Sequence, residues 1–321
     1  MTGSRTTIDV LVVGAIGVDT NVYLPSSDGA QTQVEGASVD VRDCVAHAGG
    51  YASRGYAALG WRTAYLGHVG DDPHGGWVRQ TLEQDGILTE GLVTTGRTAR
   101  SVNLVSPDGS RRNFYDPRVE GATPPDAATT KRLVRASRVV HLNIPDWARH
   151  VLPLAHAAGV PVVVDVQDAQ DPPGVAEPYR SDFVSGADLL FSSGAGLPDP
   201  EAYGREAMAA GRARAVVVGL GSRGALLVPR DGPAVLVGPV ALQPEPDVDR
   251  RYPVVDTNGA GDSLAVGVTS AHLLQGRDLV TALTCGQVCA RWCCTLRGTS
   301  DGLITAAELD RQLDRQLDML G

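Results

Sequence analysis

Short apolar runs recur along the chain and alternate with segments whose composition suits helices. The runs cover residues 10–13, 63–66, 139–142, 162–166, 189–191 and 215–218. Most of the segments between them contain Ala, Arg, Leu and Glu. Because an uninterrupted apolar run is typical of a strand buried on both faces, the pattern predicts βαβ units in an α/β fold with a doubly wound, mostly parallel sheet. Binding sites in such a sheet lie at the carboxyl ends of its strands.

Two stretches have a different, more polar pattern. Residues 20–45 are rich in Ser, Gly, Gln and Asp, and residues 98–116 alternate around the hairpin signal Asp108-Gly109. We expect these two stretches to pair into a small sheet outside the main one. Since no repeat, linker or charge block divides the chain, residues 1–321 are predicted to form a single domain with this small β insertion.

Composition and charge narrow the class of protein. The 321 residues are 43% hydrophobic and carry a net charge of −9, which argues against a nucleic-acid or membrane-surface partner. No apolar stretch reaches the ~18 residues that span a bilayer, and the N-terminus runs straight into a strand-like segment without a signal peptide. We therefore expect a cytoplasmic protein that has no membrane partner.

The five cysteines agree with a reducing compartment. Cys285, Cys289 and Cys293 are spaced four apart and so share one helical face, with Cys294 beside them. A metal site there is conceivable, but the chain has no CxxC pair and this segment has no nearby His. We expect these thiols to pack as small hydrophobic groups.

The stretch 252–267, YPVVDTNGAGDSLAVG, is the most informative for chemistry. It predicts a strand end, a turn, and a helix that opens at Gly259-Ala260-Gly261-Asp262 and runs to Leu274. Small residues at a helix N-terminus leave backbone N–H groups open to an anion, and the helix dipole adds positive charge. Asp262 beside such a site suits a general base that takes a hydroxyl proton during phosphoryl transfer, although an N-cap role alone is the simpler alternative.

Two sequence blocks decide between these interpretations. The segment DTNGAGDSLAVG resembles the second signature of the ribokinase-like (PfkB) carbohydrate and nucleoside kinase family, D-T-x-G-A-G-D-x-F. Leu59-Gly60 and the block 66–75, LGHVGDDPHG, resemble its first signature at the expected separation. Val12-Val13-Gly14 with Asp19 and the segment 221–225, GSRGA, also fit, so the resemblance spans nearly the whole chain.

The resemblance implies an ATP-dependent kinase that uses Mg²⁺ and assigns roles to particular positions. It implies Asp262 as catalytic base, Gly259, Ala260 and Gly261 as the anion hole, and Asp19 as a ligand of sugar hydroxyls. It also implies that Gly49 and Gly50 let substrate approach the backbone, and that Gly221, Ser222 and Gly224 lie beside the nucleotide. Asp256 and Thr257 match positions that often help hold a monovalent cation, which allows potassium as an activator. The stretches 20–45 and 98–116 match a β lid that covers the sugar and often makes a homodimer contact.

Three departures bear on substrate and metal use. The family's sugar-binding Asn after the glycine pair falls on Arg54 or Tyr51, depending on the register. The N-x-x-E element expected near residues 190–196 has neither Asn nor Glu, and Gly219 stands where Thr is usual. Tyr51, Arg54 and His47 are candidates to reach the pocket instead.

Other classes of function fit less well. A P-loop kinase would need a glycine loop before a Lys, and the chain's one Lys, Lys131, has none; a NAD-binding protein would need GxGxxG after the first strand. We expect a kinase acting on a small sugar or sugar derivative. The alternatives are a nucleoside kinase acting on a 5′-hydroxyl and a family member that binds but has lost catalysis.

Overall fold

A nine-stranded sheet forms the centre of the molecule. The computed structural model describes residues 7–25, 39–116, 125–168, 180–244, 252–298 and 300–318. Within these residues the strand order is β13 (Val235–Val237), β12 (Ala225–Pro229), β11 (Ala215–Gly219), β10 (Leu189–Ser193), β9 (Val162–Asp168), β8 (Ser137–Leu142), β1 (Ile8–Gly14), β4 (Thr63–Val69) and β5 (Leu88–Thr94). Neighbouring strands are parallel from β11 through to β5, and only β12 and β13 pair antiparallel. All six apolar runs of the sequence lie in strands of this sheet.

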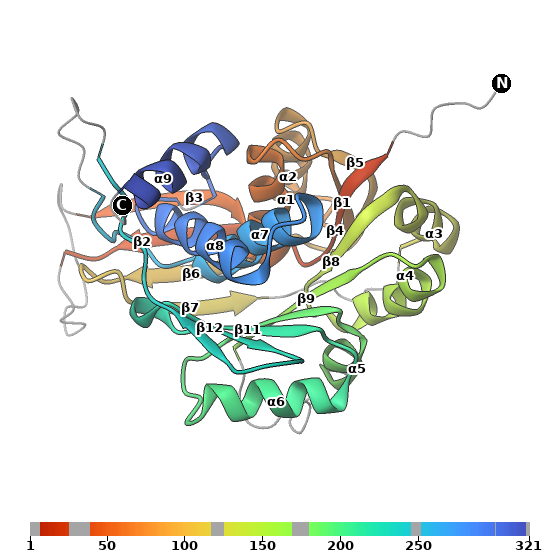
Figure 1. Ribbon diagram of the computed structural model, residues 1–321. Helices are drawn as coiled ribbons and strands as arrows, with labels where there is room; N and C mark the ends of the chain where they lie inside the picture. Colours follow the sequence, from red (N-terminus) through yellow and green to blue (C-terminus); the bar gives the residue numbers. More distant parts are fainter. Residues whose placement is uncertain are drawn as a thin grey trace.

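Helices cover both faces of the sheet, which explains why its strands are apolar throughout (Figure 1). Along β1, Val10 and Val12 belong to one hydrophobic core, and Leu11 and Val13 belong to the other. The first core also contains residues of α1 (His47–Ala58), α2 (Pro73–Gln84), α7 (Ala260–Thr269), α8 (Leu279–Cys293) and α9 (Ala306–Asp318). The second contains residues of α3 (Ala127–Ala136), α4 (Leu152–Ala158), α5 (Arg180–Gly186) and α6 (Pro200–Ala210). The predicted doubly wound α/β fold is confirmed.

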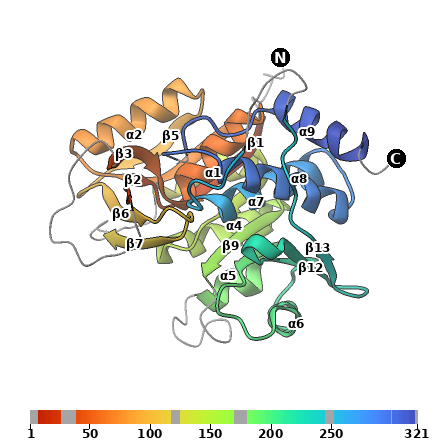
Figure 2. The ribbon, with the colours of Figure 1, turned by 90° about the vertical axis from the view of Figure 1, so that its left-hand side faces the viewer.

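A separate four-stranded sheet lies beside the main one, and we call it the lid sheet (Figure 2). Its order is β3 (Asp40–Ala46), β2 (Gly17–Tyr23), β6 (Ala99–Val105) and β7 (Arg111–Asp116). The hairpin between β6 and β7 turns at Asp108-Gly109 as predicted, with Gly109 at φ +81°. The stretch 20–45 contributes β2 and β3, but residues 26–38 within it lie outside the described residues, and β2 already begins at Gly17.

Two helices have details that the sequence does not reveal. A glycine-rich segment such as 49–60 suits a turn before a helix, yet α1 begins at His47, so Gly49 and Gly50 lie in its first turn. The helix that opens at the 259–262 turn reaches Leu274 as expected, but its last part, Ser270–Leu274, is a π-helical turn.

Small residues hold α7 close against α8. A Cβ on Gly267 would lie 2.7 Å from Cα of Gly286 and 2.8 Å from Sγ of Cys289, so the two helix backbones approach more closely than side chains would allow. Cys285, Cys289 and Cys293 are buried and form no disulfide within the described residues, as expected of packing thiols. This close packing fixes the position of the turn that starts α7.

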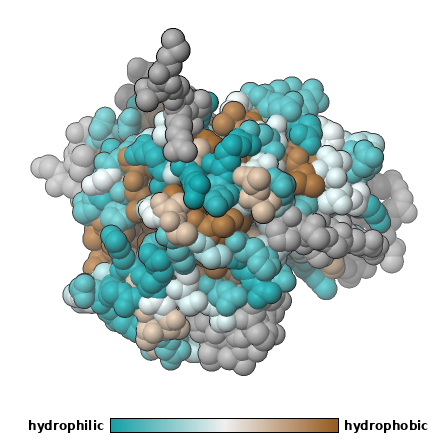
Figure 3. All heavy atoms as spheres, turned by 90° about the vertical axis from the view of Figure 1, so that its right-hand side faces the viewer, coloured by the Kyte–Doolittle hydropathy of each residue, from teal (hydrophilic) through white to brown (hydrophobic). Residues whose placement is uncertain are grey.

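The outer surface is mixed in character. On the face shown in Figure 3, hydrophilic and hydrophobic residues are interspersed. Among the described residues, we find no helix with the length and apolarity that a bilayer crossing requires.

Candidate active site

A cavity of about 1610 Å³ lies where the carboxyl ends of the main-sheet strands face the lid sheet and the start of α7. Most of the residues that the sequence predicts for the site line this cavity, and several residues that the sequence did not indicate line it as well. From the sequence-based set they include Asp19, Gly221, Ser222, Gly224, Thr257, Gly259, Ala260, Gly261 and Asp262. The position agrees with the rule that ligands bind at the carboxyl edge of an open α/β sheet.

The turn at the start of α7 is shaped to leave its amides open. Gly259 is the N-cap of α7 and adopts a left-handed conformation, φ +72°, which a glycine reaches at little cost. A Cβ at this position would lie 2.6 Å from the ring of Tyr51, so the residue also permits a close approach by α1. No side-chain hydrogen bond caps the helix, and Gly259, Ala260 and Gly261 line the cavity. The uncapped first-turn N–H groups of a helix are of the kind that can bind an anion.

Asp262 lies in the first turn of this helix and contributes to the cavity wall. Burial raises its pKa well above the ordinary 3.8, and the negative charge of Asp165 raises it further. The positive charge of Arg111 opposes this shift. A carboxylate with a raised pKa accepts a proton more readily, which suits a general base.

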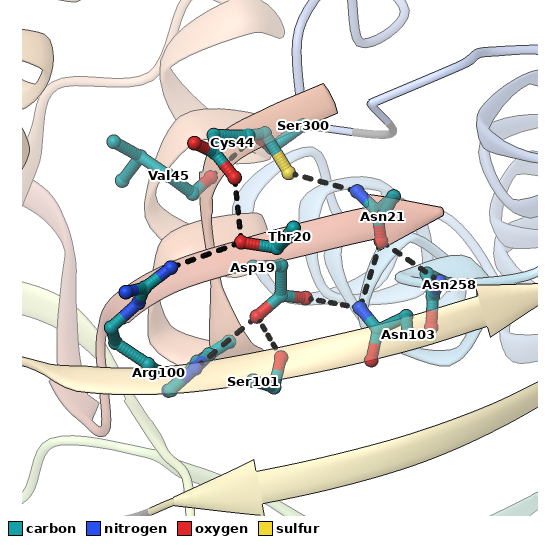
Figure 4. Close-up of polar contacts among 12 residues, drawn as sticks. Asp19, Thr20, Asn21, Cys44, Val45, Arg100, Ser101, Asn103, Asn258 and Ser300 are labelled. Carbon is teal, nitrogen blue, oxygen red and sulfur yellow. Dashed lines mark hydrogen bonds and ion pairs between the residues drawn. The ribbon is translucent and has the colours of Figure 1, made fainter. Parts of the chain in front are cut away.

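Across the cavity, Asp19 is the centre of a buried polar cluster on the lid sheet (Figure 4). Its Oδ1 accepts a hydrogen bond from Ser101 at 2.5 Å, and its Oδ2 accepts one from Asn103 Nδ2 at 3.1 Å. Nε2 of His47 lies 3.2 Å from Oδ1. Burial would raise the pKa of Asp19, but His47 and the two hydrogen bonds outweigh it and hold the pKa below its usual value. Asp19 is therefore kept ionised as a hydrogen-bond acceptor.

Strand pairing builds this cluster from distant segments. The register aligns Asp19 with Ser101 and Tyr115, and Asn21 with Asn103. Asn103 donates to Asn21 Oδ1 at 2.8 Å, and Asn258 donates to the same oxygen at 3.4 Å. Figure 4 shows these side chains pointing toward one another, while Thr20 points the other way, toward Arg100. The inner face of the lid sheet is thus a polar ladder that reaches the turn before α7.

Backbone strain is concentrated at the same cavity. Among the described residues, the non-glycine residues with positive φ are His47 at +61° and Gln167 at +58°, and both line the cavity. Such conformations cost free energy, and they cluster at active sites and ligand-binding sites. The strained backbone of His47 directs the imidazole ring toward Asp19. The centre of this ring lies 4.9 Å from the centre of the Tyr115 ring.

The opposite end of the cavity is formed by turns after β10 and β11. Gly221–Arg223 forms a 3₁₀ turn, and Gly224 follows it at φ +95°. A Cβ on Gly224 would lie 2.1 Å from the carbonyl oxygen of Val237, so only glycine fits. Residues 192–197 also line this end, and they overlap the stretch 190–196 where the N-x-x-E element was expected.

Some nominated residues lie elsewhere. Gly49 and Gly50 are buried beneath the cavity and do not line it; a Cβ on Gly49 would lie 2.6 Å from the carbonyl oxygen of Ala15. Arg54 also lies away from the cavity, because its guanidinium binds Asp85 at 2.6 Å and Asp301 at 2.7 Å. Of the two registers for the missing Asn, the structure places Tyr51 at the cavity, together with His47.

Sequence reasoning missed several residues of the cavity wall. Asn143 is buried, and neither polar atom of its amide has a hydrogen-bond partner among the described residues. Asp165, Asp168, Arg111 and Tyr115 also line the cavity. Asn143 could have been found, because it directly follows the apolar run 139–142 at the carboxyl end of a strand. Arg111 and Tyr115 depend on the lid-sheet register, which the sequence does not reveal.

Comparisons with known proteins agree with this arrangement. The family model "pfkB family carbohydrate kinase" matches residues 7–306. The acarbose 7(IV)-phosphotransferase of Actinoplanes sp. is 34% identical over 306 residues, which cover 94% of this chain and 97% of that protein. The ATP-dependent ribose-1-phosphate kinase of Halopiger xanaduensis is 30% identical, covering 88% and 92%.

A solved structure gives the same result. The microbiome-derived acarbose kinase Mak1 superimposes with a TM-score of 0.83 and 35% sequence identity, covering 97% of this chain and all of that one.

Proposed function

The chain belongs to the pfkB family of carbohydrate kinases and is an ATP-dependent phosphotransferase acting on a hydroxyl of a sugar or sugar derivative, and we propose that Asp262 is its general base. The observation that carries this assignment is the position of Asp262. Its carboxyl group lies at the cavity wall, in the same helical turn as the anion-binding amides and opposite the polar lid sheet.

The proposed step moves one phosphoryl group and one proton. The substrate hydroxyl gives its proton to the Asp262 carboxylate, and its oxygen forms a bond to the γ-phosphorus of ATP. The bond from that phosphorus to the bridging oxygen breaks, and ADP leaves. The amides of residues 259–261 stabilise the negative charge on the transferring group. Positioning and charge stabilisation supply most of the catalysis in such reactions.

Magnesium is the expected metal, because ATP-dependent transfer uses a divalent cation on the phosphates. The donor set of the cavity fits Mg²⁺, which prefers carboxylate oxygens and water. Asp165 and Asp168, which both line the cavity, are the residues that would hold it. Burial and the negative charge of Asp168 raise the pKa of Asp165, and a bound cation would stabilise the ionised form of both carboxylates. The metal would neutralise phosphate charge.

For the acceptor, we propose a sugar derivative larger than a free pentose. Asp19, Asn143 and His47 offer convergent polar groups of the kind that recognise hydroxyls. Two similar proteins are named for a phosphotransferase or kinase activity on acarbose. The cavity's volume of about 1610 Å³ leaves room for an extended acceptor beside the nucleotide.

We further propose a homodimer that works in the cytoplasm. Val41, Val102 and Phe114 are exposed on the outer face of the lid sheet, and an exposed apolar sheet face of this kind suits a subunit contact. All five cysteines lie in the described part of the chain and none is in a disulfide, which suits a reducing compartment.

A screen of ATP consumption tests the substrate class. Purified protein with ATP and Mg²⁺ is offered acarbose, maltotriose, ribose, ribose 1-phosphate, fructose, adenosine and cytidine, and ³¹P NMR identifies any phosphorylated product. We expect turnover of a saccharide. Turnover of nucleosides alone would overturn the sugar assignment, and no ATP binding at all would favour a protein that has lost catalysis.

A further inference from the structure

Each carboxylate oxygen of Asp256 accepts a hydrogen bond from a protein donor. Its Oδ2 accepts from the Tyr23 hydroxyl at 2.8 Å, and its Oδ1 accepts from the backbone N–H of Asn258 at 2.8 Å. The Tyr23 oxygen in turn accepts from the N–H of Gly298, also at 2.8 Å. A site for K⁺ needs several oxygen atoms that turn their lone pairs toward the ion. Here an N–H and an O–H group point at the two oxygens of Asp256, which makes this carboxylate a poor ligand for a monovalent cation.

Thr257, the other residue matched to a cation site, is bound by a permanent positive charge. Its Oγ1 accepts a hydrogen bond from Nη1 of Arg111 at 2.6 Å and donates to the carbonyl oxygen of Gly109 at 3.0 Å. The positive charge of Arg111 also acts on the two carboxyl groups of this turn, Asp256 and Asp262. Burial raises the pKa of each carboxyl group, and Arg111 opposes this by lowering it. A second cation at this point would be repelled.

Arg111 comes from the lid sheet rather than from the main sheet. It is the first residue of β7, two positions after the hairpin glycine Gly109. The hairpin lies directly on the segment before α7, since a Cβ on Gly109 would be 2.8 Å from Cγ1 of Val254. The guanidinium therefore reaches the turn only while this hairpin is docked on it.

We propose that Arg111 takes the place of the monovalent cation, and that the lid sheet thereby delivers the positive charge that the anion-binding turn needs for phosphoryl transfer. This inference rests on the proposed function of the turn. It makes Arg111 a positioning and electrostatic residue, and it makes activity independent of potassium. It also couples docking of the lid hairpin to assembly of the site.

The first test compares cations at constant ionic strength. Wild-type kcat measured in KCl, NaCl and choline chloride should agree within about twofold. Stimulation by K⁺ of more than about fivefold would overturn the proposal. Thermal unfolding in the same salts gives a readout that does not depend on turnover: we expect no K⁺-specific rise in Tm, and such a rise would contradict the proposal even if no acceptor were known.

The second test removes the charge. Arg111→Gln should lower kcat roughly 100-fold, the scale seen when one charge-stabilising donor is lost, with little change in the Kd of ATP. Added guanidinium should restore part of this loss, which a merely structural role would not allow. Arg112→Gln is the matched control, because Arg112 is the next residue on β7 and lies 5.0 Å over the Phe114 ring on the outer face. Normal kcat in Arg111→Gln would overturn the proposal.

These outcomes separate the inference from the proposed function. If Asp262→Asn retains normal turnover, the assigned base is wrong whatever the cation dependence. If Asp262→Asn is inactive but wild-type enzyme requires K⁺, the base stands and the role of Arg111 is wrong.

Discussion

The turn that starts α7 and the lid sheet face each other across one cavity, yet they are built by different means. The turn uses main-chain N–H groups and small residues, held in place by the close packing of α7 on α8 and of Gly259 on Tyr51. The lid sheet uses side chains, with Asp19, Ser101 and Asn103 brought together by strand register. Main-chain amides recognise any phosphoryl group, whereas a side-chain ladder recognises a particular pattern of hydroxyls. We therefore propose that the turn carries the chemistry and that the lid sheet selects the substrate.

A substitution at Gly259 should disrupt the turn that starts α7 and so test its proposed role in the chemistry. In Gly259→Ala the new Cβ would meet the Tyr51 ring in a left-handed backbone conformation, so the turn must shift. We expect kcat to fall roughly 100-fold or more and the free energy of unfolding to fall by at least about 1 kcal/mol. Steady-state kinetics and urea unfolding measure the two effects.

Gly261→Ala is the matched control for the stability effect. A Cβ on Gly261 meets nothing within 4 Å, and its φ is not positive. It should therefore unfold at the same urea concentration as wild type or slightly higher. Equal destabilisation by both substitutions would contradict this account of the turn.

Removing the charge of Asp19 should weaken sugar binding at the lid sheet and leave ATP binding unchanged. Asp19→Asn turns an ionised acceptor into an amide, and we expect KM for the sugar to rise roughly 10- to 100-fold, with KM for ATP changing little. The same chemical change at Asp43, an exposed lid residue that accepts from Thr20, should leave both KM values unchanged. An equal rise in both KM values for Asp19→Asn would argue against separate roles for the two regions.

The raised pKa of Asp262 predicts opposite effects of pH on activity and on stability. Only the ionised form is a base, so kcat/KM should fall on acidification with an apparent pKa well above 3.8. Because folding raises this pKa, ionised Asp262 destabilises the fold above pH 3.8, and the cost is complete once the pH exceeds the folded-state pKa. Asp262→Asn should thus melt at a higher temperature than wild type at pH 8, with a difference that shrinks toward pH 4. A lower Tm than wild type at pH 8 would contradict this.

The outer face of the lid sheet should govern assembly with the smallest effect on catalysis. Phe114→Asp places a charge in the exposed apolar patch and should convert the proposed dimer to a monomer in sedimentation velocity, with kcat within about threefold of wild type. Leu236→Asp makes the same change on an exposed residue of β13, away from the lid, and should leave the dimer intact. A wild-type monomer at micromolar concentration would exclude the dimer.

The two regions also differ in how far the sequence predicts them. The turn is local: Gly259, Ala260, Gly261 and Asp262 are consecutive, and their chemistry follows from a helix start with small residues. The main-sheet strands were predicted for a similar reason, since burial on both faces leaves an unbroken apolar run.

The lid could not be predicted to the same depth. Asp19, Ser101 and Tyr115 are aligned only by the parallel pairing of β2 with β6 and the hairpin to β7, a register that spans more than 80 residues of sequence. The contact of Arg111 with Thr257 depends on the same pairing. Glycine patterns alone were also ambiguous, because Gly49 and Gly50 turned out to permit close packing beneath the cavity rather than to line it.

The central claim is that Asp262 acts as a base and contributes little to binding, and one variant tests it most directly. Asp262→Asn is nearly isosteric, so kcat should fall at least ~100-fold while calorimetric Kd values for ATP and for the sugar stay within about threefold of wild type. Near-normal turnover would contradict the claim, as would a loss of activity explained entirely by weaker binding of ATP.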